Sequence, residues 1–534
     1  MSAMENPASR VENAGAMSHR QVLESMSGLL LGLLVAILSS TVVSAALPTI
    51  IEDLHGGQSS FTWVVTATLL TMTVSTPIWG KLADLFDRKR LVQMALLIFV
   101  AASVVAGFAR STQWLITCRA FQGIGVGGLT ALVQVVLSDL VSPRERGRYM
   151  GVLGSVMAVG TVAGPLLGGV ITDSFLGWRW CFFVGVPIAM ASLVTLQRTL
   201  HLPPRPKRKV KIDYLGAVLI SAGVSAILIW VSLAGHQFAW ASAWTALLVT
   251  AGVVFIAVAI RVEIKSDEPL IPTHLFRERT PVLAVIASAA VGVGLFGTSV
   301  FLSQYLQIAR GESPTASGLL TIPMMVGILI SSTLVGRRIS NTGRYKKWMV
   351  AGAGMLTVGM ALMGTLDETT SLVELGAFMA LVGLGVGMVM QNLVLVVQNS
   401  VPLGQIGSAS ALVTFFRSLG GAAGVAALGA VLGSQASSSI TSGLADRGIS
   451  GGAAAGGGST SIPDPSSLPG PVRAVVEHAY AAGTAEIFLV AAPLGLVALI
   501  AIALLKEVPL GERSGMERHA EEQDTAAAGA TGEA

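Results

Sequence analysis

Polar residues that could carry chemistry are few in this chain, and they lie in or beside long apolar runs. Asp84 and Arg88 belong to the charged segment GKLADLFDRKR, which begins at Gly80. At the ends of two successive helices they would form a charge latch; the alternative is that each charge satisfies backbone groups at its own helix end.

Arg119 lies about five residues inside the run 113–139. A buried arginine there is costly and usually functional, which predicts a coupling or gating charge rather than a side chain reaching for headgroups. Gln122, one turn along on the same face, could orient it.

Two further candidates lie near the C-terminus. Arg417 falls about nine residues into the run 408–433, close to mid-membrane, and is predicted to line a cavity rather than to form an isolated ion pair. Arginine keeps its charge, so a carboxylate must carry any coupled proton. Glu486, just inside the last apolar run, is our candidate, whereas Asp139 is expected to anchor a loop. Two buried arginines without a central acid favour neutral or anionic cargo over permanent cations.

Other chemistries find no support in the sequence. The seven histidines are scattered and no Cys/His cluster has ligand spacing, so no metal is expected. No GxxxxGK[ST] loop is present, which argues against ATP as a driving force. Central catalytic groups are missing, so we expect neither an enzyme nor a cofactor. The basic segment 201–211 is interpreted as a contact with anionic lipid rather than with nucleic acid.

The composition predicts a membrane protein. Hydrophobic residues make up 52% of the 534 residues and charged residues 12%, about half the charge of a soluble domain. Apolar runs long enough to span a bilayer predict an all-α polytopic fold with fourteen transmembrane helices. These runs are 26–47, 62–80, 91–109, 113–139, 148–171, 180–199, 214–234, 242–262, 281–303, 318–336, 348–366, 372–398, 408–433 and 484–505.

The distribution of charge predicts the orientation. With both termini placed in the cytoplasm, 27 of the 34 Lys and Arg residues fall on the cytoplasmic side, as the positive-inside rule requires. The chain then begins with a cytoplasmic N-terminal segment (1–25), a first bundle (26–199) and a basic linker (200–213). An extra helix pair (214–262), a second bundle (281–505) and a disordered cytoplasmic tail (506–534) follow. The second bundle contains a flexible external loop at 434–482. We expect a monomer in the cell membrane.

An internal repeat supports the division. Gly80 and Arg88 match Gly336 and Arg344 at an offset of 256 residues. The glycines at 123, 125, 127, 160, 164 and 169 match glycines at 383, 385, 387, 420, 424 and 429, at an offset of 260. Such an offset leaves room for two spans between two equivalent bundles of six. The predicted arrangement is therefore 6+2+6, and bundles related in this way suit rocking about a central site.

The fifth run is rich in glycine. It reads GVLGSVMAVGTVAGPLLGG, and its glycines leave a bare groove for a neighbouring helix. The proline removes a backbone donor and should bend the helix. These residues predict a hinge that lets two helices slide at close range: Gly151, Gly160, Gly164, Pro165, Gly168 and Gly169.

Several ordered motifs resemble the major facilitator superfamily, in its fourteen-helix drug:proton antiporter branch. GKLADLFDRKR resembles the loop motif between its second and third helices, with Asp87 in place of the usual second glycine, and LITCRAFQGIGVGG resembles its fourth-helix motif. The glycine-rich run matches the antiporter motif at each fixed position. LSSTVVSAALP resembles the first-helix motif and includes Ser39, Thr41 and Pro48. That motif commonly carries an aspartate where this chain has Ser39. In the family that acid is often assigned to proton coupling, so this part of the resemblance does not support coupling here.

Together these features predict a proton-driven exporter of small hydrophobic, drug-like or antibiotic-like compounds that works by alternating access. A lipid or glycolipid exporter of the same fold is the first alternative. An uptake symporter for a nutrient is the second, and the complete antiporter motif argues against it. A membrane sensor would require an attached signalling domain, for which the tail is too short and too polar.

Overall fold

The fold is built from helices throughout the part of the chain that the structure, a computed structural model, describes: residues 19–56, 58–200, 213–234, 238–266, 268–447 and 469–511. In chain order the α-helices are α2 (His19–Asp53), α3 (Gln58–Leu85), α4 (Arg88–Gly107), α5 (Thr112–Leu140), α6 (Pro143–Asp173), α7 (Trp180–Phe183), α8 (Gly185–Thr199), α9 (Tyr214–Leu233), α10 (Ala243–Lys265), α11 (Arg279–Gln304), α12 (Pro314–Leu320), α13 (Ile322–Thr342), α14 (Lys346–Met363), α15 (Leu372–Ser400), α16 (Ile406–Asp446) and α17 (Gly470–Ala503). Short helical turns are η1 (Thr273–Arg277), η2 (Tyr305–Ala309) and η3 (Leu403–Gln405).

Each predicted apolar run coincides with helix in the described residues. Run 180–199 is shared by α7 and α8, and run 318–336 by α12 and α13. Eleven helical segments of the described chain are long and apolar enough to cross a membrane. The long helices α3, α6 and α14 are not among these eleven. The fold is thus an all-helical membrane fold, and the count of fourteen spans stays a prediction.

Local sequence sets where several helices begin. Ser142 precedes α6, its hydroxyl accepts a hydrogen bond from the Glu145 amide, and Pro143 occupies the first helical turn, where its missing N–H costs nothing. At α15, Ser371 and Glu374 form a reciprocal capping box. These caps satisfy backbone donors that would otherwise be unpaired at the helix start.

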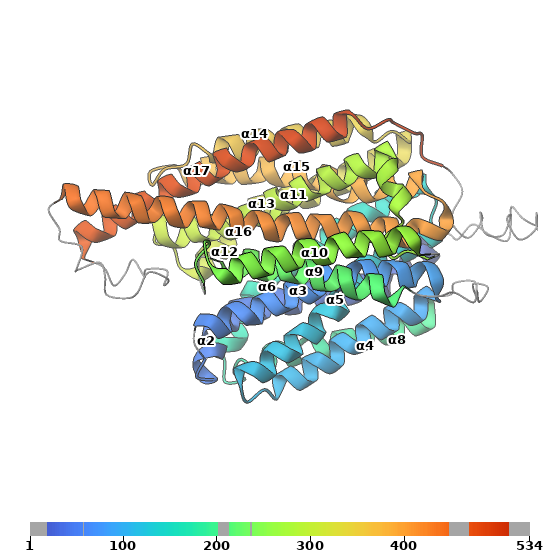
Figure 1. Cartoon of the computed structure of the whole chain (residues 1–534), viewed down its shortest axis with the longest axis horizontal. Coiled ribbons are helices and arrows are strands. Elements are labelled where there is room, and N and C mark those ends of the chain that lie inside the picture. The colour runs from blue at the N-terminus through green and yellow to red at the C-terminus, as the bar shows by residue number, and fades with distance from the viewer. Residues whose placement is uncertain are drawn as a thin grey trace, which may run out of the picture.

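The long helices form two groups that lie side by side (Figure 1). One contains α2–α8 and the other α11–α17, and their internal packing is equivalent. In the first group α3 packs on α5 and α2 on α6; in the second, α13 packs on α15 and α11 on α16. The repeat places these pairs in corresponding positions, so the contacts agree with two equivalent bundles.

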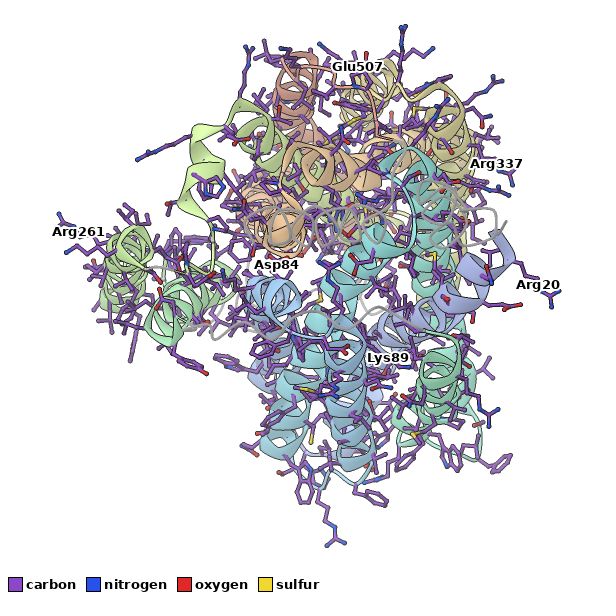
Figure 2. The ribbon with its side chains drawn as sticks, turned by 90° about the vertical axis from the view of Figure 1, so that its right-hand side faces the viewer. Arg20, Asp84, Lys89, Arg261, Arg337 and Glu507 are labelled. Atoms are coloured by element: carbon purple, nitrogen blue, oxygen red, sulfur yellow. The ribbon has the colours of Figure 1, made fainter. Side chains whose placement is uncertain are left out.

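The pair α9–α10 lies outside both groups (Figures 1 and 2). Helix α9 packs on α10, and it also contacts α3 of the first group and α16 of the second. A small apolar cluster that includes Val224, Leu228 and Phe415 fills that contact. The pair therefore covers one seam between the two bundles.

Three predicted boundaries need correction. The external loop was predicted to occupy 434–482, yet α16 continues to Asp446 and α17 already begins at Gly470. The two extensions pack on each other through an apolar cluster that includes Leu444, Val472 and Val475, which explains why glycine- and serine-rich sequence is helical here. Helix α2 takes in residues 19–25 of the predicted N-terminal segment, and residues 506–511 of the predicted tail are packed. Residues 1–18, 201–212, 448–468 and 512–534 lie outside the described residues.

Candidate functional site

The two bundles meet at two glycine crossings at one end of the molecule. A Cβ on Gly80 of α3 would lie 2.8 Å from the carbonyl oxygen of Gly407 in α16. A Cβ on Gly147 of α6 would likewise lie 2.8 Å from the carbonyl oxygen of Gly336 in α13. The repeat relates Gly80 to Gly336 and Gly147 to Gly407, so the two crossings are equivalent. We call this end, which carries segments 81–90, 140–148 and 337–347, the basic end.

Asp84 joins the bundles across the first crossing. It lies in the last turn of α3, and its carboxylate accepts hydrogen bonds from the backbone amides of Gly407 and Ser408 at 2.7 and 2.8 Å. The Ser408 hydroxyl donates a third bond at 2.7 Å. No side chain of α16 caps its own N-terminus, so Asp84 supplies the anion that the amides and the helix dipole favour. Figure 2 shows Asp84 between the two groups of helices. Asp84 thus joins the bundles with a helix end as its partner, and its role as a latch stays a prediction.

Arg88 pairs with Asp139, and both side chains are buried, with 1% and 9% of their surface exposed. Arg88 is the first residue of α4 and Asp139 is the penultimate residue of α5. The helix dipole repels a cation at a helix N-terminus and an anion at a C-terminus. The ion pair offsets both repulsions, because each charge is the other's counterion. Arg88 also donates to the carbonyl of Ala83 at 3.1 Å. Asp139, which we expected to anchor a loop, is instead the buried partner of the latch arginine.

Arg146 lies at the centre of a second network and is fully buried. Its guanidinium donates to the carbonyls of Val141 and Ser138 at 3.2 and 2.7 Å and to Oε1 of Gln398 in α15 at 3.2 Å. Gln398 in turn donates to the Ser410 hydroxyl of α16 at 2.8 Å and to the Gln134 carbonyl at 3.3 Å. The network therefore crosses from the first bundle to two helices of the second.

The segment after α17, residues 506–511, extends over the basic end, and we call it the strap. Glu507 caps α14, because its Oε1 accepts from the backbone amides of Tyr345 and Lys346 at 3.0 and 3.1 Å. Leu510 is buried, and its amide donates to the Gly343 carbonyl at 3.4 Å. The Gly511 carbonyl accepts from the Arg144 amide at 3.1 Å, at the start of α6. The strap thus runs from the second bundle to the first.

Arg119 and Gln122 contact each other as predicted. Arg119 Nη1 donates to Gln122 Oε1 at 3.2 Å, and Gln122 Nε2 donates to the Ser103 hydroxyl of α4 at 2.8 Å. Arg119 is only 3% exposed, and its Nε has no hydrogen-bond partner among the described residues. The side chain is therefore held between helices of the first bundle rather than extended toward headgroups.

Arg417 and Glu486 do not come together. Arg417 is 6% exposed and lies in α16, with its Nη1 at 3.5 Å from the carbonyl oxygen of Met390 in α15. Glu486 lies at the middle of α17, where its Oε1 accepts from Gln435 of α16 at 2.6 Å. The link between Glu486 and proton coupling stays a prediction.

The glycine-rich helix packs closely along most of its length. A Cβ on Gly151 would lie 2.7 Å from the Ser332 carbonyl of α13, and one on Gly160 would lie 3.0 Å from Ile37 of α2. Gly164 faces Thr41, whose hydroxyl donates to the Gly160 carbonyl at 3.0 Å. Gly168 is buried, whereas no atom lies within 4 Å of a Cβ on Gly169, so the predicted groove ends before that residue. Pro165 lies within continuous helix, and the predicted bend stays a prediction.

The first-helix motif occupies α2. Ser39 is 4% exposed, and its hydroxyl finds no partner among the described residues. Pro48 also falls within α2, which runs on to Asp53. The Ser39 hydroxyl, which has no hydrogen-bond partner among the described residues, thus lies at the position where the first-helix motif commonly carries an aspartate.

Sequence reasoning missed three members of this site: Arg146, Gln398 and Ser410. Arg146 was counted among positive loop charges, although the Ser-Pro start of α6 could have placed it in a first helical turn. Gln398 lies on α15, and nothing in its local sequence indicates Arg146, 252 residues away, as a partner. Ser410 of α16 belongs to the site only through its bond to Gln398.

The comparisons with known proteins agree with this architecture. Residues 29–425 match the Major Facilitator Superfamily. An uncharacterized MFS-type transporter of Mycobacterium tuberculosis is 37% identical over 493 residues, which cover 91% of this chain and 69% of the relative. The multidrug transporter protein MdtP of Bacillus subtilis is 34% identical, covering 81% and 79% of the two chains. Multidrug resistance protein 3 of the same organism is 33% identical, covering 76% and 78%.

Among solved structures, the proton:xylose symporter XylE superposes with a TM-score of 0.63 over 94% of this chain and 99% of its own, at 15% identity. The human organic anion transporter MFSD10 gives a TM-score of 0.59 over 89% and 99%, at 16% identity. At such identities these structures show the fold alone. Two helical bundles that cross at equivalent glycines, a match over most of the chain and relatives named as transporters together show that this protein is a multi-pass membrane transporter of the major facilitator superfamily.

Proposed function

We propose that the protein is a proton-driven exporter of small hydrophobic compounds in the cell membrane, with its basic end in the cytoplasm and fourteen spans arranged 6+2+6. The observation that carries alternating access is the basic end itself. Two equivalent glycine crossings, the Asp84 cap and the Arg146 network hold the bundles together at that end. These contacts describe a closed inner gate, and a transporter must break them to load cargo from the cytoplasm.

Export is the direction that the relatives support. Relatives from two kingdoms carry names such as multidrug transporter and efflux pump. The complete glycine-rich motif of α6, which packs against both α2 and α13, is the feature of this chain that resembles antiporters. Drug-like or antibiotic-like cargo follows from the relatives' names and from the apolar character of the bundles.

The test of function uses purified protein in liposomes with an imposed pH gradient. We expect uphill accumulation of a hydrophobic drug that stops when an ionophore collapses the gradient. The Glu486→Gln variant tests the proton carrier proposed from the sequence: normal gradient-driven flux in this variant would remove Glu486 from the mechanism. Flux that is unaffected by the gradient in the unmodified protein would refute proton coupling.

The cargo preference has its own test. Arg119 and Arg417 are both buried and no carboxylate is paired with either in the described structure, so we expect neutral or anionic amphiphiles to be exported better than cations. An export panel in which net charge is varied on one scaffold measures this preference. Preferential export of quaternary ammonium compounds would refute it.

A further inference from the structure

Two carboxylates meet at the base of the α9–α10 pair, outside the two bundles. Asp213 precedes α9, and its Oδ1 accepts a hydrogen bond from the Gly216 amide at 2.7 Å. Glu263 lies in the last turn of α10 and is 4% exposed. Its Oε2 accepts from the Ile271 amide at 3.0 Å, in the connector that leads to α11 (residues 268–278). One oxygen of each carboxylate is thus bonded to backbone.

The other two oxygens lie near each other, beside Gly216. Asp213 Oδ2 and Glu263 Oε1 are buried, and neither has a hydrogen-bond partner among the described residues. A Cβ added to Gly216 would lie 2.6 Å from each of these two oxygens. Glycine at 216 therefore leaves space that any side chain would fill, and both unpartnered oxygens border that space.

Among the described residues, the surrounding charges do not neutralise the pair. The cation that faces it is Lys81 of α3, and Lys81 Nζ already pairs with Glu268 Oε2 of the connector at 2.7 Å. Arg261 and Lys265, the cations near Glu263 on α10, are exposed. Two ionised carboxylates whose buried oxygens lie this near each other, without a donor between them among the described residues, are strongly unfavourable. A single proton removes the problem, because a protonated carboxyl donates to the carboxylate opposite.

We propose that Asp213 and Glu263 form a proton-binding site in which one proton, taken from water, is shared between Glu263 Oε1 and Asp213 Oδ2. The bound pair carries one negative charge, and release of the proton to water leaves two. The second charge must then be hydrated, so loss of the proton separates the end of α10 from Asp213 and from the connector.

The site is connected to the gate through short contacts. Glu263 holds the connector at Ile271, and the connector holds Lys81 through Glu268. Lys81 lies one turn before Asp84, whose carboxylate caps α16. Proton binding therefore stabilises the closed gate, and proton release loosens it. This consequence for transport rests on the proposed function, whereas the proton site itself does not.

Infrared difference spectroscopy on the full-length protein in lipid vesicles tests the site directly. At neutral pH we expect one carboxyl C=O stretching band that disappears in both Glu263→Gln and Asp213→Asn. In either variant the amide can donate to the remaining carboxylate, so the fold is kept. Glu268→Gln is the matched control and should leave the band in place. A spectrum unchanged by both variants overturns the proposal, and so does a band that sodium ions remove at constant pH, because a cation would then bridge the oxygens.

A second measurement separates the site from transport. Thermal unfolding of the unmodified protein should lose stability as pH rises through the loss of this proton, and Glu263→Gln should flatten that part of the profile. Identical pH profiles in the two proteins overturn the proposal. The carboxyl C=O band could be present while gradient-driven drug flux is absent. That result would support the proton site and refute the proposed function.

Discussion

Single side chains hold the basic end by bonding to helices other than their own. Asp84 belongs to α3 and caps α16, whereas Glu507 follows α17 and caps α14. Arg146 of α6 donates to Gln398 of α15. A helix start offers unpaired amides and a positive dipole end, so one carboxylate from a neighbouring helix satisfies it without covalent linkage. Such contacts are strong enough to define a closed state and local enough to be broken when the bundles rock.

Asp84→Asn should open the basic end. The amide keeps one acceptor oxygen but loses the charge, which weakens a cap that is worth about 1 kcal/mol or more. Spin labels at the exposed positions Phe86 and Gly404 report the separation of α3 from α16, and we expect their distance distribution to shift to longer values. Labels at Met94 and Val194, both in the first bundle, provide the control pair. An unchanged Phe86–Gly404 distribution would remove Asp84 from the gate.

Arg146→Ala should destabilise the protein. The substitution leaves two backbone carbonyls and the Gln398 amide oxygen without their donor inside a fully buried network. The expected cost is about 2–4 kcal/mol, seen as a lower melting temperature in detergent. Arg148→Ala, at an exposed position two residues away, should change the melting temperature little. Equal effects of the two substitutions would contradict the role of Arg146.

At the scale of elements, the glycine crossings set how closely the bundles approach. A methyl group on Gly80 or Gly336 would overlap the facing helix at Gly407 or Gly147. Helices that cross at glycines can come into backbone contact and separate without unlocking side chains. The same geometry at two equivalent positions means that both seams at the basic end open by the same motion.

Gly336→Ala should therefore shift the protein away from the closed state. Overpacking of this kind costs about 1–3 kcal/mol. The Phe86–Gly404 label distance and the melting temperature measure the shift. Gly354→Ala in α14 is the matched control, because no atom lies within 4 Å of a Cβ there, and alanine in a helix should be neutral or slightly stabilising. If Gly336→Ala and Gly354→Ala gave the same label distance and melting temperature, the glycine crossing would not limit how closely the bundles approach.

The positions of elements could be predicted from the sequence better than their partners. Apolar runs and the glycine repeat predicted where helices lie and which positions correspond, since both depend on local pattern. The Arg119–Gln122 bond was predictable because both residues share one helix face. The Arg88–Asp139 pair joins two helices, and Asp213 meets Glu263 across a hairpin, so spacing along the chain does not indicate them. The helical extension at 434–446 was missed because its stability comes from packing on the start of α17.

At the scale of the whole molecule, the strap connects parts of both bundles. Residues 506–511 contact α14, the turn after α13 and the start of α6. Removal of the strap should free the first bundle at its Arg144 contact and expose the amides that Glu507 caps.

A chain truncated after Leu505 should populate the open basic end several-fold more than the full chain. The reason is that the bond between the Arg144 amide and the Gly511 carbonyl forms only when the bundles are close together. Reactivity of a cysteine placed at the buried Thr414, probed with a membrane-impermeant thiol reagent, measures the opening. Truncation after Gly511 retains the strap and is the control. Equal reactivity of both truncated chains would contradict a role for the strap.

The α9–α10 pair makes the molecule unequal on its two flanks. Helix α9 packs across the α3–α16 seam, whereas no helix outside the two bundles packs across the α6–α13 seam in the described chain. When α6 separates from α13, cargo dissolved in the bilayer should thus reach the interface between the bundles from this flank only. Lipid-partitioned drugs would enter beside Gly151 and Ser332, and photoreactive analogues should label that flank in preference to the one behind α9.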